Sequence, residues 1–395
     1  MSELSYLEKL LDGVEVEWLP LGEITKYEQP TKYLVKAKDY HDTYTIPVLT
    51  AGKTFILGYT NETHGIYQAS KAPVIIFDDF TTANKWVDFD FKAKSSAMKM
   101  VTSCDDNKTL LKYVYYWLNT LPSEFAEGDH KRQWISNYSQ KKIPIPCPDN
   151  PEKSLAIQSE IVRILDKFTA LTAELTAELN IRKKQYNYYR DKLLSFEEDE
   201  VEWKTLEEVS TFANGKGHEK DISKDGKYIV VNSKFISTDG EVAKFSNKQL
   251  CPLFKDDILL VMSDLPNGKA LSKTFIIDED HKYTLNQRIG GITVKNSNEL
   301  LPKFLHYFLN RTPQLLKHDN GVDQTNLRKG QILEVKVPMI SLIKQVQIVE
   351  ILDKFDTYTK SISEGLPREI ELRQKQYEYY RDLLFSFPKP DTVNQ

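Results

Sequence analysis

One 15-residue segment occurs twice in this chain. Arg182–Phe196 and Arg373–Phe387 are identical at 11 of 15 positions, and Ile164–Phe168 returns unchanged as Ile351–Phe355. The offset between the copies grows from 187 to 191 residues, so the second copy holds four extra residues around 363–368. Agreement of this length indicates a duplication, and we expect the fold to consist of two related halves.

The stretches before these conserved segments also correspond, although more loosely. EVEW occurs at Glu15–Trp18 and again at Glu200–Trp203, and the apolar run at Pro73–Asp79 has its counterpart at Asp257–Asp264. Two variable units therefore alternate with two nearly identical segments. The N-terminal Tyr6–Leu11 resembles the end of a further conserved segment, and it would close the repeat into a ring if it packed beside the last helix.

The conserved segments carry the pattern of long helices. Residues 152–196 contain neither Pro nor Gly, and apolar positions from Ile157 to Leu175 alternate in steps of four and three, as in a heptad seam. The tandem repeat TAELTAEL at Thr172–Leu179 adds one further step of four. The second copy has a similar seam, which Gly365 and Pro367 should bend or interrupt. We predict two helices of about 40 residues, each ~60 Å long.

The variable units have the pattern of mixed structure. Short apolar runs alternate with Gly, Asn and Asp turns, and each unit has one amphipathic helical stretch, near 109–120 and 299–311. We predict an α+β fold with two globular domains separated by two long antiparallel helices that form a coiled coil, and a pseudo-two-fold repeat. The expected boundaries are 1–150, 151–196, 197–340 and 341–387, followed by a tail at 388–395.

Composition excludes several classes of protein. Charged residues make up 28% and apolar residues 40% of the chain, as in soluble globular proteins. No run approaches ~18 apolar residues and the N-terminus is acidic, so we expect a cytoplasmic protein without a membrane segment. Cys104, Cys147 and Cys251 lie too far apart for a disulfide framework or a zinc site. The net charge of −4 does not indicate nucleic-acid binding, although a local basic face can still bind phosphates.

Enzyme motifs are incomplete. AGKT at Ala51–Thr54 resembles the end of a phosphate loop, but Pro47 occupies the position of its first glycine. Gly215 and Gly217 lack the third glycine of a dinucleotide site, and the seven histidines form no metalloprotease motif. We therefore predict no catalytic residue and no metal ligand. Two alternatives stay open at this point: a coiled-coil scaffold without DNA recognition, and a nucleotide-dependent activity at Ala51–Thr54.

The whole layout resembles the DNA-specificity subunit of type I restriction-modification systems. The resemblance rests on the alternation of variable and conserved units and on four segments: QIVEILDKF at 347–355, RQKQYEYYRDLL at 373–384, IPIPCP at 143–148 and TLNQRIGG at Thr284–Gly291. The TAEL repeat is similar to that of the IC branch of the family.

This resemblance implies a non-catalytic subunit. Each variable unit would be a target-recognition domain that binds one half of a bipartite site in double-stranded DNA. The helices would set the gap and bind two methyltransferase subunits, which motor-nuclease subunits join. S-adenosylmethionine, ATP and magnesium would be bound by those partners and not by this chain.

Candidate DNA-binding residues are polar side chains on glycine-marked loops, because such side chains bind base edges and phosphates. In the first unit they are Lys53, Tyr59, Asn61, Thr81, Thr82, Asn84, Lys85, His130, Lys131, Arg132 and Trp134. In the second unit they are Lys216, His218, Asn232, Lys234, Asn267, Lys269, Asn286, Gln287, Arg288, Gln324, Asn326, Arg328 and Lys329. Candidate partner-binding residues are the exposed members of the set Tyr186, Tyr189, Arg190, Tyr377, Tyr380 and Arg381.

Overall fold

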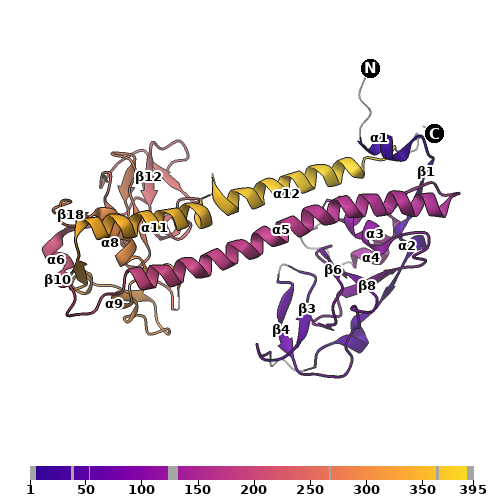
Figure 1. Cartoon of the computed structure of the whole chain (residues 1–395), viewed down its shortest axis with the longest axis horizontal. Helices are drawn as coiled ribbons and strands as arrows, with labels where there is room; N and C mark the ends of the chain where they lie inside the picture. The colour runs from indigo at the N-terminus through magenta and orange to yellow at the C-terminus, as the bar shows by residue number, and fades with distance from the viewer. Residues whose placement is uncertain are drawn as a thin grey trace, which may run out of the picture. The chain divides into compact units, whose positions relative to one another are not determined.

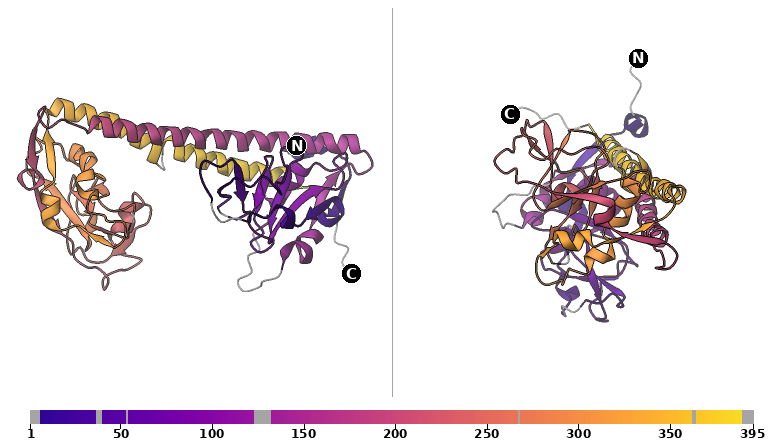
Figure 2. Two further views of the ribbon diagram at one scale, coloured as in Figure 1. Left: turned by 90° about the horizontal axis from the view of Figure 1, so that it is seen from below. Right: turned by 90° about the vertical axis from the view of Figure 1, so that its left-hand side faces the viewer.

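The computed structural model describes residues 6–36, 40–52, 54–122, 132–266, 268–361 and 364–388. The chain divides into two compact units (Figure 1). Unit 1 comprises Met1–Thr176 and Glu369–Gln395, and unit 2 comprises Ala177–Arg368. Each unit combines a β-rich domain with helices that run along one side of it (Figure 2).

In the described part of unit 1, the strands form an antiparallel sheet of four, a mixed sheet of three and a separate pair. The four-stranded sheet has the order β2 (Thr25–Glu28), β8 (Met98–Ser103), β5 (Val74–Asp78) and β6 (Asn84–Val87). The three-stranded sheet has the order β4 (Ile56–Thr60), β3 (Ile46–Leu49) and β7 (Lys92–Ala93), with β3 and β7 parallel. The pair is β1 (Val16–Pro20) with β9 (Lys142–Pro146).

Unit 2 repeats this topology. Its four-stranded sheet has the order β11 (Ser210–Asn214), β18 (Ile289–Val294), β14 (Ile258–Val261) and β16 (Thr274–Ile276). Its three-stranded sheet has the order β13 (Lys244–Ser246), β12 (Tyr228–Val231) and β17 (Tyr283–Leu285), with β12 and β17 parallel. The pair is β10 (Glu202–Thr205) with β20 (Lys336–Met339), and a short ladder joins β15 (Ser263–Asp264) to β19 (Thr325–Asn326). The two related halves expected from the sequence are confirmed.

The shorter helices complete the two units. Unit 1 holds α1 (Tyr6–Leu11), α2 (Leu21–Ile24), α3 (Leu111–Leu118) and α4 (Gln133–Ser136), with 3₁₀ turns at Pro30–Tyr33 and Tyr138–Gln140. Unit 2 holds α6 (Leu206–Val209), α7 (Ser233–Ser237), α8 (Pro302–Leu309), α9 (Pro313–Leu316) and α10 (Lys329–Leu333).

The first conserved segment is one helix, α5 (Pro151–Leu193). Its first part belongs to unit 1 and its last part to unit 2, and the dividing point after Thr176 falls inside the TAEL repeat. Within unit 1, Phe168 of α5 stacks on Tyr380 with ring centroids 5.2 Å apart. Within unit 2, Tyr189 of α5 stacks in the same manner on Phe355, at 5.7 Å. The duplicated seam therefore makes the same aromatic contact twice, between antiparallel helices.

The sequence predicts a helix of about 40 residues in the second conserved segment, bent or interrupted at Gly365 and Pro367, and the structure shows the interruption. The segment forms α11 (Leu342–Lys360) and α12 (Gly365–Leu384). Gly365 has φ +76°, and a Cβ there would lie 2.6 Å from the carbonyl oxygen of Thr357. Pro367 lies in the first turn of α12, where its missing N–H costs no hydrogen bond. The expected interruption thus coincides with the four extra residues of the second copy.

The N-terminal stub packs beside the end of α12 in unit 1. Leu7 and Leu11 of α1 belong to the same buried cluster as Leu384 and Phe385. The indole Nε1 of Trp18 also donates a hydrogen bond to the carbonyl oxygen of Pro388, at 2.9 Å. Burial of these apolar side chains ties the beginning of the described chain to its end.

Candidate nucleic-acid interface

Three loops meet at one end of the four-stranded sheet in unit 1. The backbone N–H of Asp79, just after β5, donates to the carbonyl oxygen of Ala97 in the turn before β8, at 3.0 Å. The Asp79 carbonyl oxygen accepts a hydrogen bond from the backbone N–H of Gln133, at 2.9 Å. Of the predicted residues, Thr81, Thr82 and Arg132 lie on these loops, and Asn84 and Lys85 begin strand β6 directly after the first loop. The structure therefore brings together residues that lie up to 51 positions apart.

Unit 2 joins the equivalent loops by equivalent bonds. The backbone N–H of Met262 donates to the carbonyl oxygen of Arg288 at 3.1 Å, and the Met262 carbonyl oxygen accepts from Leu327 N–H at 2.7 Å. The predicted residues gathered in this way are Gln287, Arg288, Gln324, Asn326 and Arg328, all of them exposed. Gln324 is held by a 2.8 Å hydrogen bond to the hydroxyl of Ser263, and the Lys329 ammonium lies 5.8 Å from the ring centroid of Phe212.

Other predicted residues occupy separate places. Tyr59 lies on β4 in the three-stranded sheet of unit 1, and Asn61 follows the end of that strand. Lys234 lies on α7, and Lys269 is exposed between β15 and β16. Lys53, His130, Lys131 and Asn267 lie outside the described residues.

Four predicted residues, Thr82, Trp134, His218 and Tyr186, are buried and do not fit direct contact with a macromolecule. Trp134 packs on Phe77 with ring centroids 5.0 Å apart, inside the core of unit 1. The His218 ring is buried with hydrogen bonds at both nitrogens. Tyr186 belongs to the buried cluster of unit 2, and burial raises the pKa of its phenol to about 12. These side chains are enclosed by protein, so they support their neighbours rather than bind a partner directly.

A buried ion pair holds the loops of unit 1. The ammonium of Lys99 lies 3.0 Å from the Asp79 carboxylate, and neither side chain is exposed to solvent. The other carboxylate oxygen of Asp79 accepts a hydrogen bond from the backbone N–H of Trp134, at 3.0 Å. By strand register, Met262 and Gly290 occupy these positions in unit 2. The loop junction of unit 1 thus contains a buried ion pair, whereas uncharged residues occupy the two equivalent positions in unit 2.

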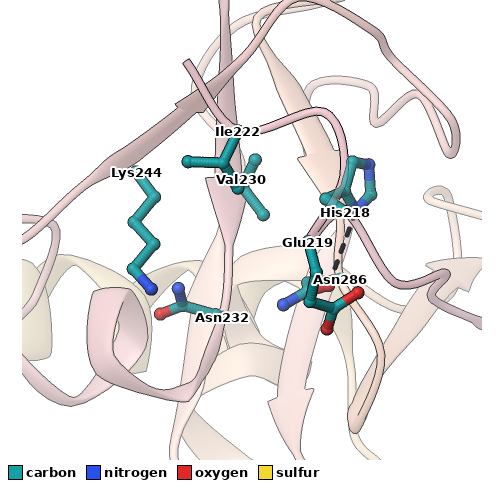
Figure 3. Close-up of a pocket in the computed structure, with 7 residues that line it drawn as sticks. All are labelled: His218, Glu219, Ile222, Val230, Asn232, Lys244 and Asn286. Carbon is teal, nitrogen blue, oxygen red and sulfur yellow. Dashed lines mark hydrogen bonds between the residues drawn. The ribbon is translucent and has the colours of Figure 1, made fainter. Parts of the chain in front are cut away.

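A pocket of about 330 Å³ opens beside the three-stranded sheet of unit 2 (Figure 3). It is lined by His218, Glu219, Ile222, Val230, Asn232, Lys244 and Asn286. Three of these, His218, Asn232 and Asn286, are predicted candidates, which the parallel pairing of β12 with β17 brings together. Lys216 adjoins them through its bridge to Asn286.

Sequence reasoning missed Lys94 and Glu219. The backbone N–H of Lys94 donates a hydrogen bond to the carbonyl oxygen of Leu49, and that of Asn286 donates to the carbonyl oxygen of Val231. Lys94 and Asn286 therefore occupy equivalent positions in the two units. Lys94 follows β7, a strand of two residues that carries too little alternation to be recognised in the sequence. Glu219 was missed because a carboxylate is not expected beside phosphates.

The conserved helices expose a pair of neighbouring tyrosines in each unit. Tyr189 and Tyr380, both predicted, are 43% and 40% exposed, whereas Tyr377 is partly buried against the core of unit 1. Their neighbours Tyr188 and Tyr379 are more exposed still, at 61% and 65%. The predicted Arg190 and Arg381 each pair with the next residue in the chain, Asp191 and Asp382, at 2.7 Å. The same surface therefore occurs once in each unit.

An aspartate on the conserved helix anchors each domain. In unit 1, Asp166 accepts a hydrogen bond from the Tyr116 hydroxyl at 2.5 Å and pairs with Lys112 at 2.9 Å. In unit 2, Asp353 accepts from Tyr307 at 2.6 Å and pairs with Lys303 at 2.7 Å. Burial and the neighbouring carboxylates raise the pKa of both phenols, so both remain hydrogen-bond donors at neutral pH.

We expect Asp166→Ala to destabilise the packing of α3 on α5 by about 2–3 kcal/mol, because a hydrogen bond to a charged group and its ion pair are lost together. Asp353→Ala is the matched variant and is expected to affect α8 in unit 2. Hydrogen exchange of the full chain measures both effects. If either single change lowered the protection from exchange equally in both units, the aspartate would not act as an anchor of its own unit alone.

The described residues contain no group of three His, Cys, Asp or Glu side chains that could hold a metal ion. In the same part of the chain, every helix is too short or too polar to cross a lipid bilayer.

Comparison with known proteins identifies relatives over the full length. The family model for the type I restriction modification DNA specificity domain matches twice, at residues 13–182 and 198–372. The chain is 67% identical over 410 aligned residues to the specificity subunit of the type I restriction enzyme EcoR124I/EcoR124II from Escherichia coli, covering 100% of both proteins. Its fold is similar to the crystal structure of a type I restriction-modification S subunit from M. genitalium, with a TM-score of 0.58, 17% identity and coverage of 98% and 99%. A structure described under complex assembly and conformational transition of the type I R-M system matches with a TM-score of 0.53, 14% identity and coverage of 94% and 97%.

Proposed function

We propose, since this chain belongs to the family of type I restriction-modification DNA specificity subunits, that each of its units binds one half of a bipartite DNA site. The observation that carries this proposal is a repeated scaffold with unlike side chains. Asp79, Ala97 and Gln133 occupy one loop junction, and Met262, Arg288 and Leu327 occupy its equivalent. Base edges are distinguished by the pattern of donors and acceptors that they meet, so two junctions of different chemistry suit two different sequences.

The conserved helices indicate how many partner subunits this chain binds. The exposed tyrosine pairs on α5 and α12 are nearly identical in sequence, and this supports binding of two copies of one partner. By family, that partner is a methyltransferase subunit, and motor-nuclease subunits complete the assembly. We propose that S-adenosylmethionine, ATP and magnesium bind to those subunits, and that this chain supplies specificity without catalysis in the cytoplasm. The comparisons give no support to a scaffold without a role in DNA recognition.

Methylation mapping tests this function. The full chain is co-expressed with a matching methyltransferase subunit, and methylated positions are determined across a genome. We expect a split motif, in which two short blocks flank an unspecified spacer of fixed length. Methylation without sequence preference, from a complex that is stably assembled, would overturn the proposal.

Removal of the exposed tyrosines is expected to weaken assembly. Tyr188→Ala with Tyr189→Ala should lower affinity for the methyltransferase subunit by about tenfold or more, because aromatic side chains are frequent hot spots of interfaces. Calorimetric titration measures the affinity, and circular dichroism checks the helix. Tyr186→Ala is the contrasting variant, since this buried side chain should affect folding first. Parallel losses of helicity and affinity in the double variant would point to a structural role alone.

A further inference from the structure

Glu219 in unit 2 is an exposed carboxylate that the protein holds in one orientation. Its Oε1 accepts a 2.6 Å hydrogen bond from the Gln287 amide. Its Oε2 lies 2.5 Å from the place where a Cβ on Gly217 would stand. The carboxylate thus folds back against a glycine, and any larger residue at 217 would displace it. Phosphates repel a carboxylate, so in a domain proposed to recognise DNA an oriented carboxylate suits contact with a base edge.

Asn286 lies beside it on the lining of the same pocket and is also oriented. The His218 Nδ1 lies 2.8 Å from the carbonyl oxygen of Lys216. Since a carbonyl only accepts hydrogen bonds, this nitrogen carries the proton. The same Nδ1 lies 3.5 Å from the Asn286 Oδ1 (Figure 3). The Asn286 oxygen therefore faces the histidine, and its NH₂ group is left to donate elsewhere.

The backbone around Asn286 is equally constrained. A Cβ on Gly215 would stand 1.9 Å from the Asn286 carbonyl oxygen, so only glycine permits this approach. The Asn286 N–H donates to the carbonyl oxygen of Val231, at 3.2 Å. The His218 Nε2 in turn lies 2.9 Å from the hydroxyl of Thr284. Both glycines of the segment NGKGH thus serve to place one acceptor and one donor.

We propose that Glu219 and Asn286 bind one base pair of the half-site that unit 2 recognises. The Glu219 carboxylate accepts from the exocyclic amino group of cytosine or adenine, and the Asn286 NH₂ donates to the acceptor next to it in the major groove. In a C·G pair the amino group of cytosine lies beside O6 of guanine, and in an A·T pair the amino group of adenine lies between its own N7 and O4 of thymine. Gln287 and His218 are positioning residues for this contact. The inference rests on the proposed function and names residues of specificity within it.

Unit 1 has different chemistry at this place. The ammonium of Lys94, which is equivalent to Asn286, donates to the Tyr40 hydroxyl at 2.7 Å. The Tyr40 side chain also covers Gly58, where an added Cβ would lie 2.7 Å away. A lysine that contacts a tyrosine thus stands where unit 2 has Asn286. Changes at Glu219 should therefore affect one half-site only.

The experiment is selection of DNA from duplexes randomised in both half-sites. The wild-type chain and the Glu219→Gln variant are compared, each as the full chain bound to its methyltransferase subunit and at the same salt concentration. We expect Glu219→Gln to lose about tenfold or more of its discrimination at one position of one half-site, with the other half-site and the gap unchanged. Glu198→Gln, an exposed carboxylate in the linker before β10, carries the same change of charge and should leave the selected sequence unaltered.

Three further measurements identify the base pair that Glu219 and Asn286 contact. Asn286→Asp, which replaces the donor by an acceptor, should change preference at the same base pair, and Gln287→Ala should relax it more weakly. The wild-type protein is also tested on DNA in which the amino group is missing, with purine in place of adenine or a pyrimidinone in place of cytosine. Its affinity for this DNA should fall by as much as the affinity of Glu219→Gln falls on natural DNA. The base whose replacement has this effect is the one bound.

The outcomes separate the two proposals. If wild type selects a split site and Glu219→Gln selects the same site with equal discrimination, this inference is wrong while the proposed function stands. If wild type itself selects no split sequence, the proposed function fails.

Discussion

Asp79→Asn is expected to destabilise the four-stranded sheet of unit 1 by about 3–5 kcal/mol, since it leaves the Lys99 ammonium buried without a counter-charge. Lys99→Met should cost a similar amount because it leaves the Asp79 carboxylate alone. Either change should also release the segment at Gln133 and Trp134, which the Asp79 side chain and backbone hold. Hydrogen exchange at β5 and β8 of the full chain, at increasing denaturant, measures the loss.

The double variant Asp79→Asn with Lys99→Met is the matched control. Removing both charges leaves no unpaired buried ion, so it should cost clearly less than the two single changes together. Glu28→Gln is the second control, because the Glu28–Lys32 pair is exposed to solvent and should contribute far less to stability than the buried pair. Single variants at Asp79 and Lys99 that are no worse than Glu28→Gln would show that the buried pair does not hold these loops.

A third TAEL unit inserted after Leu179 is expected to change the gap between half-sites by one to two base pairs. Four residues lengthen a helix by ~6 Å, which lies between the rise of one and of two base pairs at ~3.4 Å each. They also rotate the helix by about 40°, close to the twist of about 35° of one base pair. The dividing point between the two compact units falls within this repeat. We expect binding at the original gap to be lost and both half-site sequences to be retained.

Selection from duplexes with variable spacers measures the gap directly. The matched control places the same four residues in the linker after Phe196, outside α5. That insertion leaves the helix length unchanged, and the original gap should persist. If the insertion inside α5 left the gap unchanged, the helix would not be the element that sets the spacing between the half-sites.

The duplication, the long first helix and the two α+β units were predictable from the sequence by itself. Identity over Arg182–Phe196 and Arg373–Phe387 allows few arrangements, and the stretch 152–196 has neither Pro nor Gly to end a helix. Gly365 and Pro367 also marked the interruption of the second helix correctly. These features are local or repeated, so they can be recognised without knowing which residues meet in space.

Only the tertiary structure decided which candidate side chains are available. Trp134, His218 and Tyr186 have the residue types of binding sites, yet packing buries all three. Lys94 and Asn286 became equivalent only through the register of β7 and β17 against their parallel neighbours. Glu219 gained its orientation from Gln287, 68 residues away. Sequence patterns record periodicity along the chain, whereas burial and register depend on long-range pairing, and that pairing exists only in the folded units.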